Sequence, residues 1–532
     1  MCGVLGVIGK SPVIGEIVDA LLFLQHRGQD AAGAATYDGT AFRTHKQMGL
    51  VREVFASDDL TRHRGTVGIG HVRYPTIGGG DVDDAQPFTV NSPFGIAMAH
   101  NGNLTNFKGL KDELKDRCRR HVGSNCDVEV ILNVFADELA RRTSGVGANP
   151  ASPETTEAIF ESVRSTFRRC RGSYSVCAVV AGVGLLAFRD PFGIKPLIYG
   201  SRADNGGKRW MVASESCALE SLGYQVERDV KPGEAILFRE DEEPIVRQVA
   251  EGKSRLCIFE FIYFANPASM IDGISVYHAR MRLGQMLAKR WGERNAALAK
   301  KSIEVDRVIP VPDSSRPAAQ AMASQMKRPF REGLLKNRYI GRTFIMPGNE
   351  NCRRGIRFKL SPVRLEIEGR RVLLVDDSIV RGNTAHEIIR MVRDTGAKQV
   401  HMASSCPPIR NPCVYGVDMS TRREFIASSN VVQAGGGANG TPKAAKSRRP
   451  QRAEAKGDAP RQDTTESEVC HKIGADSLLY QTIEDMVEAV RAPQDPQRQF
   501  CMACMDGRYP TGDVTPEVLA EIENERLAAG PK

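Results

Sequence analysis

The sharpest change from hydrophobic to polar positions in this chain lies at residues 372–384. Four apolar residues, Val372-Leu373-Leu374-Val375, are followed by Asp376-Asp377-Ser378-Ile379-Val380-Arg381-Gly382-Asn383-Thr384. The apolar run predicts a buried parallel strand, and the polar switch predicts a loop at its carboxyl end. Between residues 385 and 393, Ile388, Ile389 and Val392 fall on one helical face, so the loop leads into a helix.

A loop in this position is suited to ligand binding. Ligands bind at the carboxyl ends of parallel strands, and the free N–H groups of a helix amino terminus suit a phosphate. The adjacent carboxylates of Asp376 and Asp377 suit ribose hydroxyls or Mg²⁺, which takes carboxylate and substrate oxygens. The alternative is an acidic turn after a core strand, which would be the better interpretation of a bare Asp-Asp pair.

Apolar runs predict further elements along the chain. We expect strands at residues 2–9, 308–312 and 400–406, a hairpin within 171–188, and a helix at 280–290. A polar, acidic stretch at 239–251 is typical of a linker. A chain of 532 residues predicts more than one domain, because single cores rarely exceed about 250–300 residues.

Composition narrows the class of protein. The chain is 41% hydrophobic and 26% charged, and no apolar run approaches the ~20 residues of a membrane span. The first residues lack a basic region, so we expect no targeting signal and a cytoplasmic protein. The net charge of +9 comes without an aromatic-interleaved basic motif, which favours phosphorylated substrates over nucleic acid. Thirteen cysteines in such a protein argue against a disulfide framework.

The stretch at 372–384 resembles the phosphoribosyl pyrophosphate (PRPP) loop of type I phosphoribosyltransferases. The resemblance implies that PRPP is bound by all nine residues from Asp376 to Thr384, with Lys336 and Arg338 from a basic loop closing over the pyrophosphate. It also implies that Mg²⁺ is held by Asp376, Asp377 and Ser314, although a solvated turn serine is nearly as good an interpretation of Ser314. A second basic cluster at 353–359 is equally well explained as a solvated surface.

Cys2 begins an apolar strand, and removal of Met1 would leave its thiol beside a free α-amine. That amine can take the thiol proton, so one residue supplies nucleophile and base. A buried structural cysteine is the alternative. The stretches at 24–33, 70–76 and 99–104 together resemble the glutaminase domain of class II, amino-terminal-nucleophile amidotransferases.

This second resemblance implies a role for each matching residue. Cys2 is the nucleophile, and Asn101 with the Gly102 N–H forms the oxyanion hole. Arg73 pairs with the α-carboxylate of glutamine, and Asp127 with its α-amine. For His26 and Arg27 we expect a structural or gating role.

Four cysteines suggest a metal centre. The family divides into members with and without a 4Fe-4S cluster, and this chain offers Cys257, Cys413, Cys501 and Cys504 at positions that resemble the ligands. A structural zinc is the second alternative, and four buried thiols without metal are the third.

Taken together, the chain resembles the amidophosphoribosyltransferases. The resemblance implies an α/β multidomain protein with an αββα glutaminase sandwich and a type I phosphoribosyltransferase domain with a parallel sheet. It implies conversion of glutamine, PRPP and water to 5-phosphoribosylamine, glutamate and diphosphate, with ammonia channelled from Cys2 to the PRPP site. It further implies Mg²⁺, purine nucleotides as feedback inhibitors and a dimeric or tetrameric homo-oligomer, with no nucleic acid and no membrane.

Two alternative functions are disfavoured by these residues. A sugar-isomerising amidotransferase would share the Cys2 domain but would lack the Asp376-Asp377-Ser378 loop. A regulatory phosphoribosyltransferase-like binding protein would lack the Cys2 set. The expected divisions are 2–240 (glutaminase), 252–428 (phosphoribosyltransferase), 431–463 (disordered insertion), 464–515 (a segment with Cys-x-x-Cys docking on the phosphoribosyltransferase domain) and 516–532 (tail).

Overall fold

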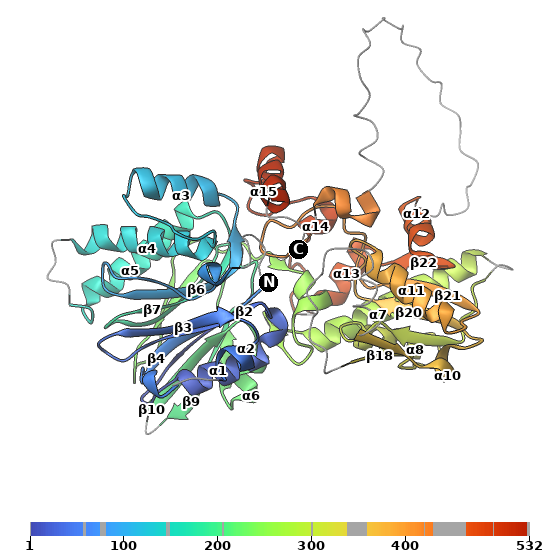
Figure 1. The fold of residues 1–532 in the computed structure, drawn as a ribbon, viewed down its shortest axis with the longest axis horizontal. Helices are drawn as coiled ribbons and strands as arrows, with labels where there is room; N and C mark the ends of the chain where they lie inside the picture. Colours follow the sequence, from blue (N-terminus) through green and yellow to red (C-terminus); the bar gives the residue numbers. More distant parts are fainter. Residues whose placement is uncertain are drawn as a thin grey trace, which may run out of the picture. The chain divides into compact units, whose positions relative to one another are not determined.

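The computed structural model describes most of the chain, namely residues 2–56, 60–74, 81–144, 149–204, 207–298, 302–337, 359–419, 421–428, 464–492 and 494–528. The expected insertion at 431–463 lies outside these residues. The chain divides into two compact units (Figure 1). Unit 1 comprises Met1–Arg280, Pro412–Met419 and Val490–Lys532, and unit 2 comprises Met281–Asn411 and Ser420–Ala489.

Unit 1 is built on two antiparallel sheets. The first has the strand order β11-β9-β10-β1-β4-β2-β3, with β1 (Gly3–Ile8), β2 (Ala31–Tyr37), β3 (Phe42–Met48), β4 (Val67–Arg73), β9 (Ile198–Asp204), β10 (Gly207–Ala213) and β11 (Gln225–Asp229). The second has the order β13-β12-β8-β7-β6-β5, with β5 (Phe88–Val90), β6 (Ile96–Leu104), β7 (Gly172–Val180), β8 (Gly184–Arg189), β12 (Glu234–Phe238) and β13 (Ile245–Gln248).

Helices cover the outer face of each sheet in unit 1 (Figure 1). The first sheet packs against α1 (Ile14–Phe23), α2 (Val51–Val54) and α6 (Ser216–Ser221), and the second against α3 (Phe107–Asp116), α4 (Asp127–Thr143) and α5 (Pro153–Arg169). Alternate residues of β1 serve two cores: Leu5 and Val7 face the helices, whereas Val4 and Ile8 pack between the sheets. The expected αββα sandwich is confirmed.

Shorter elements complete unit 1. They are η1 (Gln25–Arg27), η2 (Leu60–Arg62), η3 (Val82–Asp84), η4 (Glu260–Phe264), β14 (Leu256–Cys257), β15 (Met270–Ile271), β16 (Ile274–Ser275), β23 (Phe500–Cys501), α14 (Ala503–Asp506) and α15 (Pro516–Ala528). β14 pairs in parallel with β23, which ties the carboxyl-terminal segment to this unit. The linker expected at 239–251 is wrong in part, because Ile245–Gln248 forms the edge strand β13.

Unit 2 is centred on a parallel sheet. Its order is β17-β20-β21-β22, with β17 (Arg307–Pro310), β20 (Arg371–Asp376), β21 (Gln399–Ser404) and β22 (Ser477–Tyr480). One face packs against α7 (Val276–Leu298), which begins in unit 1, and α8 (Arg316–Gln325). The other face packs against α11 (Asn383–Asp394) and α12 (Thr464–Ile473). The expected parallel-sheet domain is confirmed.

The hydrophobic pattern at 372–375 explains why β20 is central. Val372 and Leu374 face α11, and Leu373 and Val375 face α7 and α8, so both faces of the strand are buried. The predicted strand and the helix after it are therefore confirmed. Unit 2 also contains β18 (Leu334–Lys336), β19 (Leu360–Pro362), α10 (Arg364–Ile367), α13 (Ile483–Val490, ending in unit 1), η6 (Arg422–Glu424) and η7 (Ile426–Ser428).

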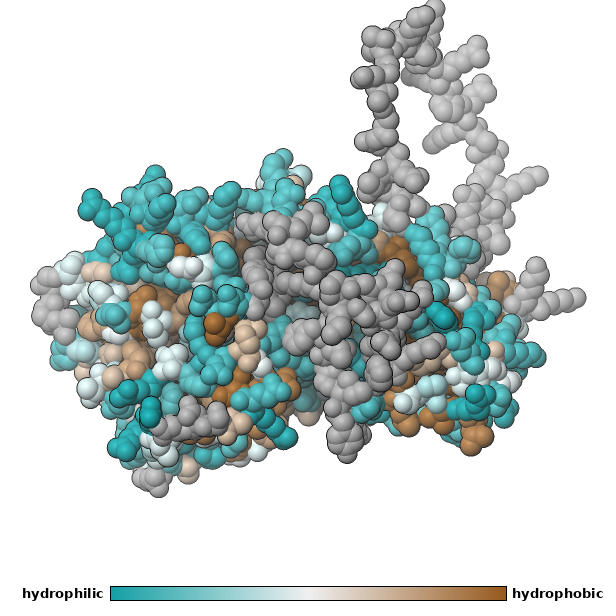
Figure 2. All heavy atoms as spheres, in the orientation of Figure 1, coloured by the Kyte–Doolittle hydropathy of each residue, from teal (hydrophilic) through white to brown (hydrophobic). Residues whose placement is uncertain are grey.

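On the face shown in Figure 2, the described residues form no extended apolar band. Figure 2 shows a mainly hydrophilic face with hydrophobic residues in small, separate groups. Within the described ranges, no helix combines the length and the apolar character needed to span a bilayer.

Candidate functional site

Cys2 lies at the start of β1, half-buried in a pocket of unit 1. Its nitrogen donates a hydrogen bond to Asn101 Oδ1 at 3.2 Å, and its Sγ lies 3.7 Å from the carbonyl oxygen of Tyr74. Because Met1 precedes Cys2 in this chain, that nitrogen is an amide and stands in for the α-amine that removal of Met1 would expose. The amine would then be held by Asn101 beside its own thiol.

Asn101 and Gly102 bring the expected oxyanion donors into the same pocket. Both belong to β6, and Asn101 is fully buried. The Oδ1 of Asn101 is occupied by Cys2, whereas its Nδ2 has no hydrogen-bond partner among the described residues. A buried donor without an acceptor costs about 1–3 kcal/mol, which an oxyanion at this position would recover.

Arg73 and Asp127 supply opposite charges at the pocket wall. Arg73 ends β4, and its guanidinium lies 3.3 Å from the Asp84 carboxylate. Asp127 begins α4, and one carboxylate oxygen accepts from the Leu104 N–H at 2.9 Å. A cation and an anion in one pocket match the two charged groups of an amino acid.

The whole lining comes from unit 1. It comprises Cys2, Arg73, Tyr74, Gln86, His100, Gly102, Asn103, Phe107, Asn125, Cys126 and Asp127. The structure thus gathers every predicted glutaminase residue, with Asn101 directly behind Cys2. Their individual roles stay predictions. Gln86 also contributes to this lining. Its side-chain nitrogen lies 3.2 Å from His100 Nδ1, and its side-chain oxygen accepts the backbone N–H of His100. The sequence alone does not indicate Gln86, because no motif surrounds it.

Arg27 anchors Cys2 from the other side. Its Nε donates to the Cys2 carbonyl at 3.0 Å, one terminal nitrogen contacts Glu215, and the other donates to Glu260 at 2.8 Å. Burial alone would lower the pKa of Arg27, but the carboxylates of Glu260 and Glu215 raise it well above its ordinary value. The guanidinium is therefore a permanent cation, and Arg27 braces the nucleophile.

Glu215 pairs with both His26 and Arg27 in this network. His26 Nε2 lies 2.8 Å from Glu215 Oε1, and the Ser269 hydroxyl donates to Oε2 at 2.7 Å. Burial would raise the pKa of Glu215, but His26 and Arg27 hold it far below its ordinary value. These contacts favour the structural side of the role expected for His26 and Arg27.

The predicted PRPP loop joins β20 to α11 in unit 2. Gly382 has φ +82°, and a side chain there would collide with Ile426, so glycine is required for the turn into the helix. No side chain caps α11, which leaves the first N–H groups of Asn383 and Thr384 available to a phosphate. Arg381 lies 3.4 Å from Glu424, on the neighbouring η6.

Two carboxylates crowd the start of this loop. Asp376 Oδ1 accepts from the Asp377 N–H at 2.9 Å, and the Ser378 hydroxyl donates to Asp377 Oδ1 at 2.7 Å. Ser314 Oγ donates to the other Asp377 oxygen. Burial, and then the charge of Asp377, raise the pKa of Asp376 well above its ordinary value. The pair is thus a place where a cation would relieve repulsion.

These oxygens fit Mg²⁺ by their chemistry. Two carboxylates and a hydroxyl are hard donors, and Mg²⁺ completes its shell with water and substrate oxygens rather than with an all-protein cage. Among the described residues, no group of three or more His, Cys, Asp and Glu side chains is arranged to hold a metal ion. The metal would therefore be shared with the substrate.

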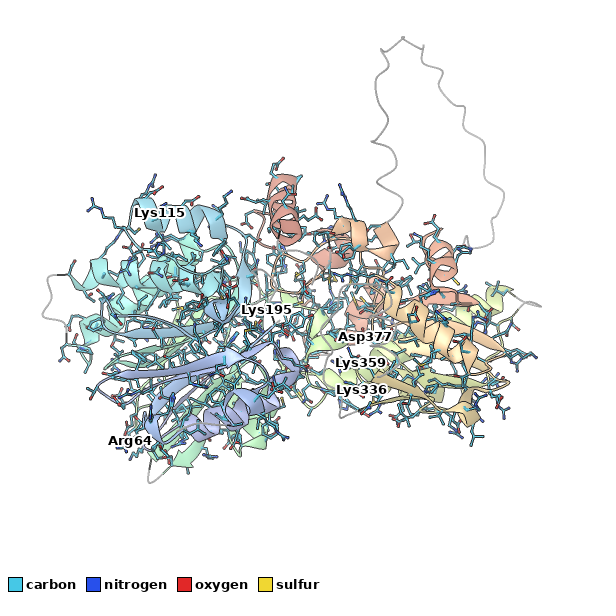
Figure 3. All side chains as sticks on the ribbon, in the orientation of Figure 1. Arg64, Lys115, Lys195, Lys336, Lys359 and Asp377 are labelled. Carbon is cyan, nitrogen blue, oxygen red and sulfur yellow. The ribbon has the colours of Figure 1, made fainter. Side chains whose placement is uncertain are left out.

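Only part of the predicted basic loop is described. Lys336 Nζ donates to Asp313 Oδ2 at 2.9 Å, and the Asn337 N–H donates to the Lys359 carbonyl at 2.8 Å. Figure 3 labels Lys336, Lys359 and Asp377, all in unit 2. Arg338 and the basic residues at 353–357 lie outside the described residues.

Three of the four predicted cluster ligands are neighbours in unit 1. Cys257 and Cys501 occupy partner positions on β14 and β23, and Cys504 follows in α14. Burial raises the pKa of Cys257 to about 11, opposed by Lys195 and reinforced by Cys413. Burial, with Cys257 and Cys413 nearby, raises the pKa of Cys501 far above its usual value.

Burial therefore keeps the thiols of Cys257 and Cys501 neutral. Sulfur donors suit iron or zinc, but the described side chains do not form a group that could hold either. Four cysteine thiols are therefore suitable ligands for an iron–sulfur cluster, but the described side chains are not arranged around a metal site.

Comparisons with known proteins place the chain in a family. Residues 76–221 match the model of the glutamine amidotransferase domain, and residues 285–425 match that of the phosphoribosyl transferase domain. Amidophosphoribosyltransferases of Pseudomonas aeruginosa and Escherichia coli are 44% and 43% identical, over 99% of this chain and 96% of each relative.

A solved structure agrees along nearly the whole chain. It is the glutamine PRPP amidotransferase of B. subtilis, complexed with ADP and GMP, which is 34% identical and superposes with a TM-score of 0.77, covering 97% of this chain and 98% of that one. A second solved structure is that of the allosteric regulatory enzyme of purine biosynthesis. It is 35% identical and superposes with a TM-score of 0.79, and the match covers 98% of this chain and 99% of that chain. The chain belongs to the amidophosphoribosyltransferase family.

Proposed function

We propose that this protein uses glutamine to aminate PRPP, forming 5-phosphoribosylamine, glutamate and diphosphate in the first committed step of purine synthesis. The observation that carries the proposal is the pocket of unit 1. There a thiol with an adjacent nitrogen faces an unpartnered buried amide donor, between a fixed cation and a fixed anion. The acidic loop and uncapped helix of unit 2 supply the complementary phosphate and ribose chemistry.

The glutaminase half needs only residues of the pocket. The α-amine exposed by loss of Met1 takes the Cys2 proton, and the thiolate adds to the side-chain carboxamide of glutamine. The Asn101 Nδ2 and the Gly102 N–H stabilise the oxyanion, while Arg73 and Asp127 hold the amino acid head. The C–N bond breaks, ammonia leaves with a proton from the amine, and water hydrolyses the thioester to glutamate.

The transferase half lies in unit 2. Asp376 and Asp377 contact ribose hydroxyls, the residues from Ser378 to Thr384 hold the 5-phosphate, and Lys336 and Arg338 face the diphosphate. Mg²⁺, held by Asp376, Asp377 and Ser314, would offset the charge of the diphosphate. Ammonia released at Cys2 is channelled to the anomeric carbon, where the C–O bond to diphosphate breaks as the C–N bond forms.

A coupled assay tests the proposal. Purified protein with glutamine, PRPP and Mg²⁺ should release glutamate and diphosphate in equal amounts, and neither product should appear at that rate when PRPP is omitted. Glutamate release stimulated by fructose 6-phosphate instead of PRPP would favour the sugar-isomerising alternative. No turnover of glutamine would favour a binding protein.

Nucleotides and self-association extend the proposal. The B. subtilis relative was solved with ADP and GMP, and we propose that purine nucleotides inhibit this protein as well. We also propose a homo-oligomer of two or four chains. Inhibition curves with ADP and GMP, and sedimentation of the purified protein, test these two statements independently.

The four cysteines remain a separate proposal. We propose a 4Fe-4S cluster on Cys257, Cys413, Cys501 and Cys504, because three separate segments bring these thiols into one unit, although the described side chains are not grouped to hold a metal in this structure. Elemental analysis of anaerobically purified protein is the test. Iron with sulfide at four atoms per chain is expected, zinc at one per chain would replace the cluster by a zinc site, and neither metal would leave four buried thiols.

A further inference from the structure

The segment Pro412–Met419 packs against the strand that carries the oxyanion hole. It belongs to unit 1, although the residues before and after it belong to unit 2. The Asn103 side chain donates to the Val414 carbonyl at 2.9 Å, and the Ser173 hydroxyl donates to the Tyr415 carbonyl, also at 2.9 Å. Both hydrogen bonds are buried, and Ser173 lies opposite Asn103 in the β6–β7 pairing.

Gly416 lies close to the backbone of Gly102. Its φ is +89°, and a Cβ added to it would lie 2.6 Å from the Gly102 carbonyl oxygen, 2.9 Å from the carbonyl carbon and 3.3 Å from the Cα. All three atoms are backbone, so they cannot turn away as a side chain would. Gly102 is also crowded by β7, because a Cβ added to Gly102 would lie 1.9 Å from the Ser173 carbonyl oxygen and 2.7 Å from the Tyr174 Cα. The backbone of Gly102 is therefore closely packed by both β7 and Gly416.

From this packing we infer that Gly416 is a positioning residue for the glutaminase reaction: it packs against the carbonyl group and Cα of Gly102, and so fixes the Gly102 N–H, which is joined to the same Cα, at the distance that oxyanion stabilisation requires. The inference rests on the proposed glutaminase function of Cys2, Asn101 and Gly102. Oxyanion donors act at about 2.7–3.1 Å, so a shift of a few tenths of an ångström weakens the transition state. Glutamine itself is held by Arg73 and Asp127, which Gly416 does not touch.

Gly416→Ala tests the inference, with Gly39→Ala as a matched control. Gly39 has φ +91°, almost the same φ, but an added Cβ there meets nothing within 4 Å. The control therefore also places alanine at a positive φ, but without the collision. In the full-length protein with PRPP and Mg²⁺, we expect Gly416→Ala to lower kcat for glutamine about ten- to a hundredfold, with KM changed less than about twofold. Gly39→Ala should match the parent protein.

Inhibitor binding separates positioning from general damage. An aldehyde analogue of glutamine forms a tetrahedral adduct with the Cys2 thiol and needs the oxyanion hole, whereas the product glutamate does not. In Gly416→Ala the Ki of the aldehyde should rise by the same factor as kcat falls. The Ki of glutamate and the synthesis of phosphoribosylamine from added ammonia should stay at the parent level.

Ser173→Ala provides a second variant if Gly416→Ala does not fold. It removes the hydrogen bond to Tyr415 and adds no atoms, and we expect the same pattern at about three- to tenfold. Equal aldehyde binding in parent and variants, or an equal loss of ammonia-dependent synthesis, would overturn the positioning role. Failure of the proposed function is distinguishable, because the parent protein would then not hydrolyse glutamine, or Cys2→Ala would still do so.

Discussion

The proposed glutamine pocket of unit 1 and the proposed PRPP loop of unit 2 are constructed in opposite ways. The pocket takes its chemistry from β1, β4, β6 and α4, so its residues are spread from Cys2 to Asp127. The loop takes its chemistry from one continuous stretch, Asp376 to Thr384, between one strand and one helix. A site assembled from four elements depends on the whole sandwich, whereas a site on one turn depends on the strand and helix that flank it.

The charges of the two sites are balanced differently as well. In the pocket, Arg73 already has Asp84 and Asp127 already has the Leu104 N–H. In the loop, the carboxylates of Asp376 and Asp377 are neighbours, and burial, followed by their repulsion, raises the pKa of Asp376. The charges of the pocket are therefore already balanced, whereas those of the loop would be balanced by a cation bound with the substrate.

The largest expected effect separates the two sites. Cys2→Ala removes the nucleophile, so glutamine-dependent synthesis should fall to background, while synthesis from added ammonia should stay close to the parent rate. Diphosphate release measured with each nitrogen donor gives both numbers. A folded variant that lost both activities would mean that the two reactions share one site.

The converse change breaks the loop and spares the pocket. Asp376→Asn and Asp377→Asn each remove charge from the ribose and magnesium side, and we expect kcat/KM for PRPP to fall about a hundredfold or more. Basal hydrolysis of glutamine, assayed without PRPP, should survive in both variants. Unchanged constants for PRPP would show that the substrate binds elsewhere.

A smaller effect tests the preorganised charges of the pocket. Asp127→Asn keeps an acceptor for the Leu104 N–H but loses the anion for the α-amine of glutamine. We expect KM for glutamine to rise about tenfold with little change in kcat, because the interaction is present in both the ground state and the transition state. A fall in kcat at constant KM would instead place Asp127 in the chemical step.

The smallest expected effect concerns two pairs of neighbouring aspartates, Asp229 with Asp272 and Asp376 with Asp377. In unit 1, Asp229 lies beside Asp272, which is paired with Arg189 at 2.8 Å. Burial, and then the charge of Asp272, raise the pKa of Asp229 from 3.8 to about 7. A raised pKa means that protonated Asp229 stabilises the fold below about pH 4, and that this contribution is lost as the pH rises towards 7.

Asp229→Asn should therefore stabilise unit 1 by an amount that grows as the pH rises from about 4 towards 7 and stays constant above it. We expect its melting temperature to exceed that of the parent by about 2–4 °C at pH 8 and to equal it near pH 4, measured by calorimetry. The same gain at both pH values would mean that titration of Asp229 does not contribute. Asp376→Asn is the comparison, because burial and the charge of Asp377 raise the pKa of Asp376 in the same direction.

The sequence predicts the continuous site better than the assembled one. The apolar run at 372–375 and the helical spacing of Ile388, Ile389 and Val392 suffice for the strand, loop and helix. The pocket residues were found through local motifs around Cys2, Arg73 and Asn101. Gln86 was missed, because its contact with His100 arises only when β5 and β6 pair.

Interactions between distant segments could not be predicted. Glu215 and Glu260 lie 188 and 233 residues from Arg27 in the sequence, and no local motif predicts that either of them pairs with Arg27. The sequence predicts a linker where the edge strand β13 lies, because the residues of this strand are half-buried or exposed and show no apolar alternation. Such contacts follow from topology, which a local pattern does not encode.

The division of the chain into interleaved segments limits how this protein can be recombined. The polypeptide passes between the units after Arg280, Asn411, Met419 and Ala489. A gene fragment ending at residue 280 would encode both sheets of the sandwich but not Gly416 behind Gly102, nor β23 beside β14. Exchange of a whole catalytic half with another protein therefore requires four junctions instead of one.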